Sequence, residues 1–242
     1  MPGSNTFCRT IRLYQSGIHP CAYLDRKSAK TLFVDPDITP DTTLYSTLID
    51  QGFRRSGGLV YRPDCPDCRG CVSLRVPVQE FTPRRSQRRV WQRNLDRFHV
   101  REESVENNPE HYRLFERYIS ARHQDGSMAN TTENEFHQFI ASSWSDTRGF
   151  SFYHDNRLVA VAVSDILPQG LSAVYTFFDP AYQQSSPGVY TILWQIEECR
   201  QRNLPWLYLG YWIDACDKMA YKKEYLPHEA FLDDRWIRVE KE

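Results

Sequence analysis

Residues 171–209 read LSAVYTFFDPAYQQSSPGVYTILWQIEECRQRNLPWLYL and contain the clearest succession of secondary-structure patterns in the chain. Residues 171–178 form a β-prone apolar run that ends at Asp179-Pro180. A turn rich in Ser, Pro and Gly then leads into a helical pattern at 189–202. A second short strand follows at 206–209. The stretch therefore predicts a strand, a long helix and another strand in succession.

The neighbouring segments extend this order. The patterns predict helices at about 109–124 and 133–143, a hairpin with strands at 150–154 and 157–167, and a last helix around 218–224. Two helices, three antiparallel strands, a long helix, a strand and a helix form the element order of the acetyltransferase-like α/β fold. In that fold two neighbouring strands splay apart and a ligand binds between them. We therefore expect this fold in the C-terminal half.

The first hundred residues show shorter secondary-structure patterns than the C-terminal half. They show short strands and turns, one helix at about 41–51, and an alternating strand at 72–78 that Pro77 places near a sheet edge. A polar run from Glu102 to Pro109 follows and marks a boundary. The predicted fold class is α+β. It has a small mixed N-terminal domain with a cysteine cluster at 1–105, and an acetyltransferase-like (GNAT-like) α/β domain at 106–242.

Bulk composition limits the function classes. The chain has 242 residues, a formal net charge of −1 and 40% apolar residues, which are ordinary globular values. A nucleic-acid surface must therefore be local. No window approaches about 18 apolar residues, so no membrane partner is expected. The N-terminus lacks the apolar core of a secretion signal, which predicts a cytoplasmic protein with reduced thiols.

Residues 61–94, YRPDCPDCRGCVSLRVPVQEFTPRRSQRRVWQRN, begin with three cysteines at successive C-x-x-C spacing, Cys65, Cys68 and Cys71. Two thiolates on one tight turn suit zinc or an iron–sulfur cluster. Cys21 is the best candidate for a fourth ligand. Reduced thiols without a bound ion remain the alternative. We therefore take it as a hypothesis that these cysteines bind a structural zinc ion or an iron–sulfur cluster.

The same stretch ends in an arginine-rich segment with helical composition over about 86–98. Its five arginines are Arg84, Arg85, Arg88, Arg89 and Arg93, with no acidic residue among them. Guanidinium groups bind phosphates through paired N–H donors, so the segment favours a nucleic-acid surface. Gln87, Trp91 and Asn94 could contact sugar or base, and Arg9 and Arg12 could extend the surface. A solvated helix paired with internal acids is the alternative.

Two C-terminal features could contact a small ligand. Asp179 precedes a turn that opens the long helix, whose free N–H groups can bind an anion, although Asp-Pro also begins many ordinary turns. Gly210 lies in an aromatic strand and indicates a bulge or a close backbone approach. The three lysines downstream could bind a carboxylate or phosphate, or could form a solvated helix.

Taken together, these motifs resemble the bacterial aspartate/glutamate leucyltransferases, relatives of the arginyl-tRNA–protein transferases. The resemblance rests on residues 61–94 and on GLSAVYTFFDPAY, SPGVYTILWQIEECRQRNLPWLYLGYWI and KMAYKKEYLP. The eukaryotic arginyl enzymes carry Cys-x-Tyr-Cys near the N-terminus, whereas the matching stretch here is Cys21-Ala-Tyr-Leu24.

The resemblance implies transfer of leucine from Leu-tRNA to proteins with N-terminal Asp or Glu, which marks them for degradation. It implies no required cofactor and no DNA partner, and tRNA as the ligand of the five arginines. We take Asp179, Tyr175 and Tyr211 as candidate catalytic residues. Candidates to bind the acceptor carboxylate are Arg75, Lys218, Lys222 and Lys223. An arginyl-transferring relative, a coenzyme-A-dependent N-acetyltransferase and a non-catalytic zinc-ribbon-like module are the alternatives.

Overall fold

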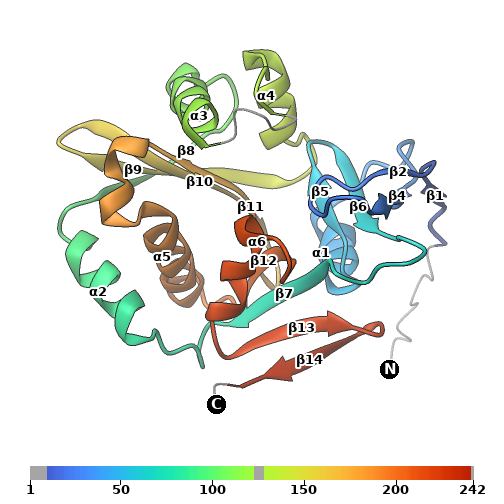
Figure 1. The fold of residues 1–242 in the computed structure, drawn as a ribbon. Helices are drawn as coiled ribbons and strands as arrows, with labels where there is room; N and C mark the ends of the chain where they lie inside the picture. The colour runs from blue at the N-terminus through green and yellow to red at the C-terminus, as the bar shows by residue number, and fades with distance from the viewer. Residues whose placement is uncertain (1–9, 123–127, 241–242) are drawn as a thin grey trace, which may run out of the picture.

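The computed structural model describes residues 10–122 and 128–240, which form three β-sheets and their surrounding helices (Figure 1). The strands are β1 (Leu13–Gln15), β2 (His19–Pro20), β3 (Ser28–Ala29), β4 (Thr31–Val34), β5 (Arg54–Ser56), β6 (Leu59–Pro63), β7 (Val72–Pro77), β8 (His99–Glu103), β9 (Asp146–His154), β10 (Arg157–Leu167), β11 (Gly170–Phe178), β12 (Trp206–Trp212), β13 (His228–Leu232) and β14 (Arg235–Val239). The helices are α1 (Thr42–Asp50), α2 (Arg85–Asn94), α3 (Pro109–Arg122), α4 (Glu133–Ile140), α5 (Pro187–Gln201) and α6 (Asp217–Ala220), with 3-10 helices η1 (Pro180–Ser185) and η2 (Tyr221–Glu224).

The order of elements expected from the sequence is confirmed from α3 to α6. Asp155 and Asn156, which connect β9 to β10, have φ angles of 49° and 63°, the left-handed values that a two-residue hairpin turn requires. The helix expected at 218–224 is divided into α6 and η2. The hairpin of β13 and β14 is not among the elements that the sequence predicts.

The largest sheet has eight strands in the order β14-β13-β7-β12-β11-β10-β9-β8. The expectation that Pro77 places β7 near a sheet edge is wrong, because β7 pairs with β13 on one side and β12 on the other. Pro77 is the last residue of the strand, where a missing N–H interrupts no further pairing. The sheet takes strands from both sides of residue 105, and a domain boundary there stays a prediction.

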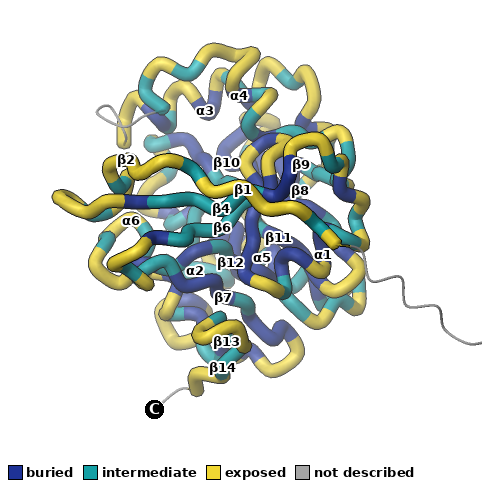
Figure 2. The backbone as a smooth tube through the Cα atoms, turned by 90° about the vertical axis from the view of Figure 1, so that its right-hand side faces the viewer, coloured by how far each residue is buried: buried dark blue, intermediate teal, exposed yellow. Residues whose placement is uncertain are grey.

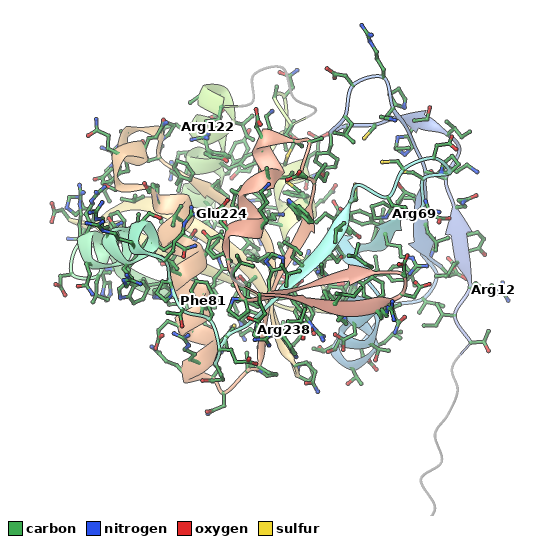
Figure 3. All side chains as sticks on the ribbon, turned by 60° about the horizontal axis from the view of Figure 1, so that its bottom comes forward. Arg12, Arg69, Phe81, Arg122, Glu224 and Arg238 are labelled. Atoms are coloured by element: carbon green, nitrogen blue, oxygen red, sulfur yellow. The ribbon has the colours of Figure 1, made fainter. Side chains whose placement is uncertain are left out.

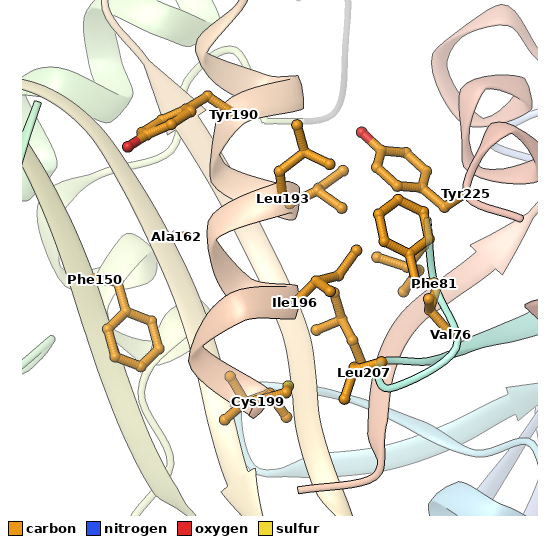
Figure 4. Close-up of a cluster of buried hydrophobic side chains, with 14 of the residues drawn as sticks. Val76, Phe81, Phe150, Ala162, Tyr190, Leu193, Ile196, Cys199, Leu207 and Tyr225 are labelled. Carbon is orange, nitrogen blue, oxygen red and sulfur yellow. The ribbon is translucent and has the colours of Figure 1, made fainter. Parts of the chain in front are cut away.

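Helices cover both faces of the β8–β11 part of this sheet (Figure 1). On one face, α3 and α4 pack Phe115 and Phe136 against Phe177 of β11. On the other face, Leu193 and Ile196 of α5 enter the main apolar cluster (Figure 4). Figure 2 shows α5 and the central strands as the most deeply buried backbone and β1 as largely exposed. The two apolar layers fix the sheet between the helices.

The parallel strands β11 and β12 separate after a short paired region. Only residues 170–172 pair with residues 206–208, whereas β11 continues to Phe178 and β12 to Trp212. A register shift follows Tyr208 in β12, and Gly210 has a φ of +76°, which glycine adopts without strain. The structure thus has the splayed pair of strands that the element order predicts, with the bulge expected at Gly210.

The four-stranded sheet, β1-β4-β6-β5, and α1 join the large sheet through a separate apolar cluster. Tyr45 and Ile49 of α1 pack there with Leu167 of β10 and Tyr208 of β12. Further along β12, the Tyr211 hydroxyl donates to the Gly52 carbonyl at 3.0 Å and Arg54 of β5 lies 6.0 Å from the Tyr211 ring, so the N-terminal segment also reaches the C-terminal half of β12. No helix of the two described ranges is long and apolar enough to span a membrane.

Candidate functional site

Five arginines at α2 form an exposed group that we call the arginine surface: Arg84, Arg85, Arg88, Arg89 and Arg93. In Figure 3, α2 (green) projects nitrogen-bearing side chains outward. Arg84 forms an ion pair with Glu224, Arg88 donates to the Pro83 carbonyl at 2.6 Å and Arg93 donates to the Gln184 carbonyl at 2.7 Å. Arg85 and Arg89 form no hydrogen bond or ion pair with any described residue. These two cations are free to bind an external anion.

The opposite face of α2 packs inward, which corrects part of the sequence analysis. Gln87 and Asn94 are buried, and the Asn94 side chain donates to the Ser185 carbonyl at 2.8 Å. Trp91 is half-buried and contacts the ring of Tyr190 on α5 at 5.4 Å. Trp91 therefore packs α2 against α5, Asn94 connects it to η1, and Gln87 connects it to η2 by donating to the Glu224 carbonyl at 3.3 Å. The helix ends at Asn94 rather than near Phe98.

A hollow of about 400 Å³ lies beyond the C-terminal end of α2, lined by Arg97 and Arg101 and also by Asp96 and Asp155. Arg12, in contrast, lies on the opposite side of the molecule from α2 in Figure 3, so it does not extend this surface. Arg9 lies outside the described residues.

The cysteines expected to bind a metal are free thiols on neighbouring segments, namely Cys21, Cys65, Cys68 and Cys71. Burial raises the pKa of Cys71 to about 12, and the three other thiols add to this shift. Four thiols match the donor chemistry of zinc or an iron–sulfur cluster. However, within the two described ranges no three His, Cys, Asp or Glu side chains converge closely enough to hold an ion. A bound metal at these thiols therefore stays a prediction.

Asp179, the candidate proton relay, ends β11 and begins η1. Its Oδ1 accepts the Ala181 N–H at 3.0 Å, and its Oδ2 accepts from Arg157 at 2.6 Å. Arg117 of α3 lies 3.8 Å from the same carboxylate, beside a hollow of about 510 Å³. The carboxylate thus caps a 3-10 turn and neutralises arginines on the α3 side of the sheet. A catalytic role for Asp179 stays a prediction.

Tyr175 and Tyr211 lie in different environments. Tyr175 is half-buried and contacts Phe115 and Phe139, and burial raises its pKa. Tyr211 is buried and donates its hydroxyl to the Gly52 carbonyl at 3.0 Å, and burial raises its pKa as well. Among the residues that the structure describes, no hydrogen bond or ring contact joins Tyr175, Tyr211 and Asp179. The three candidates therefore do not form one cluster.

Three of the cations proposed for the acceptor carboxylate are engaged or exposed. The Arg75 guanidinium binds Glu229 at 2.7 Å and Asp50 at 3.0 Å, and it lies between the rings of Trp206 and Trp236 at 3.9 and 4.2 Å. This arrangement holds the sheet together and occupies the side chain. Lys223 pairs with Asp214 at 2.5 Å on the surface, and Lys218 is exposed on α6.

Lys222 differs from the other lysines because it is buried. Its Nζ donates to the Tyr211 carbonyl at 2.8 Å. Burial, followed by the positive charge of Arg54, lowers its pKa to about 7. Arg54 of β5 is buried too, and sequence reasoning missed it. Its only sequence signal is the doublet Arg54-Arg55 in a short strand, and this pattern does not say which arginine lacks a partner.

Two sequence-family models together match about four fifths of the chain. Residues 19–89 match the N-terminal region described as "Arginine-tRNA-protein transferase, N terminus". Residues 110–232, about half of the chain, match "Arginine-tRNA-protein transferase, C terminus". The two matched segments include the cysteines at 65–71, the start of the arginine surface and both splayed strands.

Individual relatives agree with this family. The chain is 46% identical to a protein from Hahella chejuensis named aspartate/glutamate leucyltransferase, over 96% of this chain and 98% of the relative. Proteins of the same name from Teredinibacter turnerae and Pseudomonas aeruginosa are 46% and 45% identical, each over 95% of this chain and over 95% and 97% of their own lengths.

Among solved structures, the chain is similar to the C-terminal domain of a putative lysylphosphatidylglycerol synthetase from Agrobacterium fabrum. The TM-score is 0.45 at 12% identity, covering 75% of this chain and 57% of that one. Both family matches and the relatives at 45–46% identity lead to the same assignment. The chain therefore belongs to the arginine-tRNA-protein transferase family and is an enzyme of its leucyltransferase branch.

Proposed function

We propose that this enzyme transfers leucine from Leu-tRNA to the N-terminal α-amine of proteins that begin with Asp or Glu, which marks them for degradation. The observation that carries the proposal is the match over 94–96% of the chain to relatives named aspartate/glutamate leucyltransferase. Because identity near 45% extends over both halves of the chain, the proposal concerns the whole reaction and not one domain alone.

The arginine surface is the proposed tRNA contact. Five exposed guanidinium groups, two of them without an internal partner, present the charge and the donor geometry that a phosphate backbone requires. DNA is not a proposed partner, because the reaction uses the aminoacyl ester that only tRNA carries.

The proposed chemistry is aminolysis of an activated ester. The acceptor α-amine attacks the leucyl carbonyl carbon, the new amide C–N bond forms, and the ester C–O bond breaks. The terminal ribose oxygen of the tRNA leaves with the proton released by the amine. An α-amine has a reference pKa of about 7.7–8.0, so a useful fraction is neutral near pH 7 without a strong base. Orientation of the two substrates and stabilisation of the oxyanion are the main requirements.

We further propose that the C-terminal half is acetyltransferase-like, with the donor and acceptor meeting where β11 and β12 separate. The element order and the short pairing of these strands support this placement. Transfer requires no cofactor in this scheme, and any metal at the cysteines would be structural. The supply of aminoacyl-tRNA places the reaction in the cytoplasm.

The decisive experiment measures labelled leucine transfer from Leu-tRNA to peptides that begin with Asp, Glu or Asn. Parallel reactions contain Arg-tRNA or acetyl coenzyme A as the donor. We expect leucine on the Asp and Glu peptides and little on the Asn peptide. Transfer of arginine instead would favour the arginyl relatives, and transfer of acetyl groups would favour an acetyltransferase. Binding of tRNA without transfer of any group would favour a non-catalytic nucleic-acid-binding module.

A further inference from the structure

Two buried cations lie near each other without a carboxylate partner among the described residues: Arg54 of β5 and Lys222 of η2. Arg54 is 5% exposed and Lys222 is 9% exposed. Burial and the surrounding tyrosines act on the pKa of Arg54, burial and Arg54 act on the pKa of Lys222, and no Asp or Glu acts on either. Burial lowers the pKa of Arg54, and the charge of Arg54 helps to lower that of Lys222. A buried positive charge without a counterion lowers the stability of the fold. Two such charges at one place therefore indicate a functional role.

Two of the three nitrogens of the Arg54 guanidinium have no hydrogen-bond acceptor among the described residues. Its Nη1 donates to the Phe53 carbonyl at 2.7 Å, whereas its Nε and Nη2 are buried without a hydrogen-bond partner among the described residues. The next residue, Arg55, uses the same two nitrogens to bind Asp165, with Nε at 2.6 Å and Nη2 at 2.7 Å from the two carboxylate oxygens. Arg54 therefore presents, unoccupied, the pair of N–H donors that Arg55 uses to bind a carboxylate.

The position of the pair matches the proposed meeting point of the substrates. Lys222 Nζ approaches the bulge of β12 so closely that a Cβ on Gly210 would lie 3.6 Å from it. The Arg54 guanidinium lies 5.5 and 6.0 Å from the rings of Tyr208 and Tyr211. Tyr208 is the last residue of β12 that pairs with β11, and Gly210 and Tyr211 lie beyond the paired region. Tyr61, which also acts on the pKa of Arg54, is half-buried.

We infer that Arg54 and Lys222 bind the side-chain carboxylate of the N-terminal Asp or Glu of the acceptor, an assignment that rests on the proposed function. The planar carboxylate pairs with Nε and Nη2 of Arg54, and the Lys222 ammonium supplies a second charge. The tyrosine rings contact the methylene groups of the acceptor side chain. A neutral amide of the same shape leaves both cations uncompensated, which is how such a site rejects Asn and Gln.

The test compares Arg54→Met with the wild-type enzyme on two peptides that differ only in Asp or Asn at the first position. We expect the ratio of kcat/KM values, Asp over Asn, to fall at least tenfold, mainly through a higher KM for the Asp peptide. Affinity for Leu-tRNA should not change. The thermal midpoint should stay the same or rise, because the substitution removes an unpaired buried charge. Aspartic acid α-amide should raise the thermal midpoint of the wild type and not that of the variant.

Arg62→Met is the matched control, since Arg62 lies on the neighbouring strand β6, where it forms an ion pair with the exposed Asp234 at 3.7 Å and donates to the Gln51 carbonyl at 3.1 Å. It should leave the Asp/Asn ratio unchanged. Arg54→Lys keeps the charge without the paired donors, and it should lose part of the preference.

Several outcomes overturn the inference. An unchanged ratio in Arg54→Met does so, and so does a thermal midpoint lower than that of Arg62→Met, which would show a structural role. Weaker tRNA binding with an unchanged ratio would assign the cations to a phosphate of the donor. If the wild type transfers no leucine to any peptide, the proposed function fails. The shift caused by aspartic acid α-amide then still decides whether the pair binds a carboxylate.

Discussion

Arg55 of β5 holds Asp165 of β10 through two hydrogen bonds of 2.6 and 2.7 Å, and both side chains are almost completely buried. Thr147 donates to the same carboxylate at 2.7 Å. This ion pair joins the four-stranded sheet to the eight-stranded sheet. It thereby sets the position of β5, and with it Arg54, relative to β12.

Breaking this pair should destabilise the whole chain. Asp165→Asn leaves the Arg55 charge buried without a counterion, and we expect a loss of about 3–5 kcal/mol in the free energy of unfolding. Urea denaturation followed by tryptophan fluorescence measures it. Glu80→Gln breaks the exposed pair with Arg238 and serves as the control, with little change expected. A loss in Asp165→Asn no larger than in this control would show that the buried pair does not hold the sheets together.

Removing the two unpaired cations of the arginine surface should weaken tRNA binding. We expect Arg85→Ala with Arg89→Ala to reduce affinity at low salt and to flatten the dependence of log K on log salt. Each lost phosphate contact changes the slope by about 0.7–0.9. Filter binding at several salt concentrations gives both quantities. Arg235→Ala, an exposed arginine on β14, is the control. If the double variant has the same tRNA affinity and the same salt slope as this control, α2 does not contact tRNA.

Lys222 predicts a specific pH dependence of stability. Its pKa is lowered from 10.5 to about 7 in the folded chain. Between these values the unfolded chain holds a proton that the folded chain has lost, so the contribution of this group to stability rises with pH across that window. Below about pH 7 the buried ammonium exerts its full destabilising effect. Lys222→Met should therefore be more stable than the wild type at low pH, and the gap should close as the pH rises.

Urea midpoints of both proteins at about pH 6, 8 and 9.5 measure this gap, and all other titrating groups cancel in the difference. Lys223→Met, one residue away on the surface, should show no such trend. A gap between Lys222→Met and the wild type that is constant over this range would mean that Lys222 keeps an ordinary pKa.

Arg75 should matter for stability and not for the acceptor. Arg75→Lys loses the stacking between Trp206 and Trp236 and the paired contact with Glu229, which we expect to cost about 1–3 kcal/mol. The KM for the Asp peptide should stay at the wild-type value, because the guanidinium is already bound to internal carboxylates. A raised KM with unchanged stability would restore Arg75 as an acceptor contact.

The cysteine hypothesis has a direct analytical test. If the thiols of Cys21, Cys65, Cys68 and Cys71 draw together around an ion at about 2.3 Å, anaerobically purified protein should contain about one zinc ion or one cluster per chain. Cys68→Ser should lower that content. Cys199→Ser, in the apolar core, should not. Elemental analysis that finds neither zinc nor iron in the wild type would exclude a resident metal at these residues.

The sequence by itself determined much of the local structure. Periodicity of apolar residues is a property of neighbouring residues, so the succession from α3 to α6 and the turn at Asp155-Asn156 could be read directly. The exposed arginines of α2 were also predictable, because five cations without an interleaved acid have no local partner. The hairpin of β13 and β14 was not, since its strands are short and half-exposed.

Only the tertiary structure decided which cations are paired. Arg54 and Arg55 are adjacent in sequence, yet Arg55 binds a carboxylate 110 residues away and Arg54 binds none in the described part of the chain. Neighbouring strand residues point to opposite faces, and their partners come from distant segments that local patterns do not specify. For the same reason the sequence could not show that Arg75 is occupied or that Lys222 is buried. Long-range packing sets the burial and pairing of charges, and those two properties separate a structural cation from one available to a substrate.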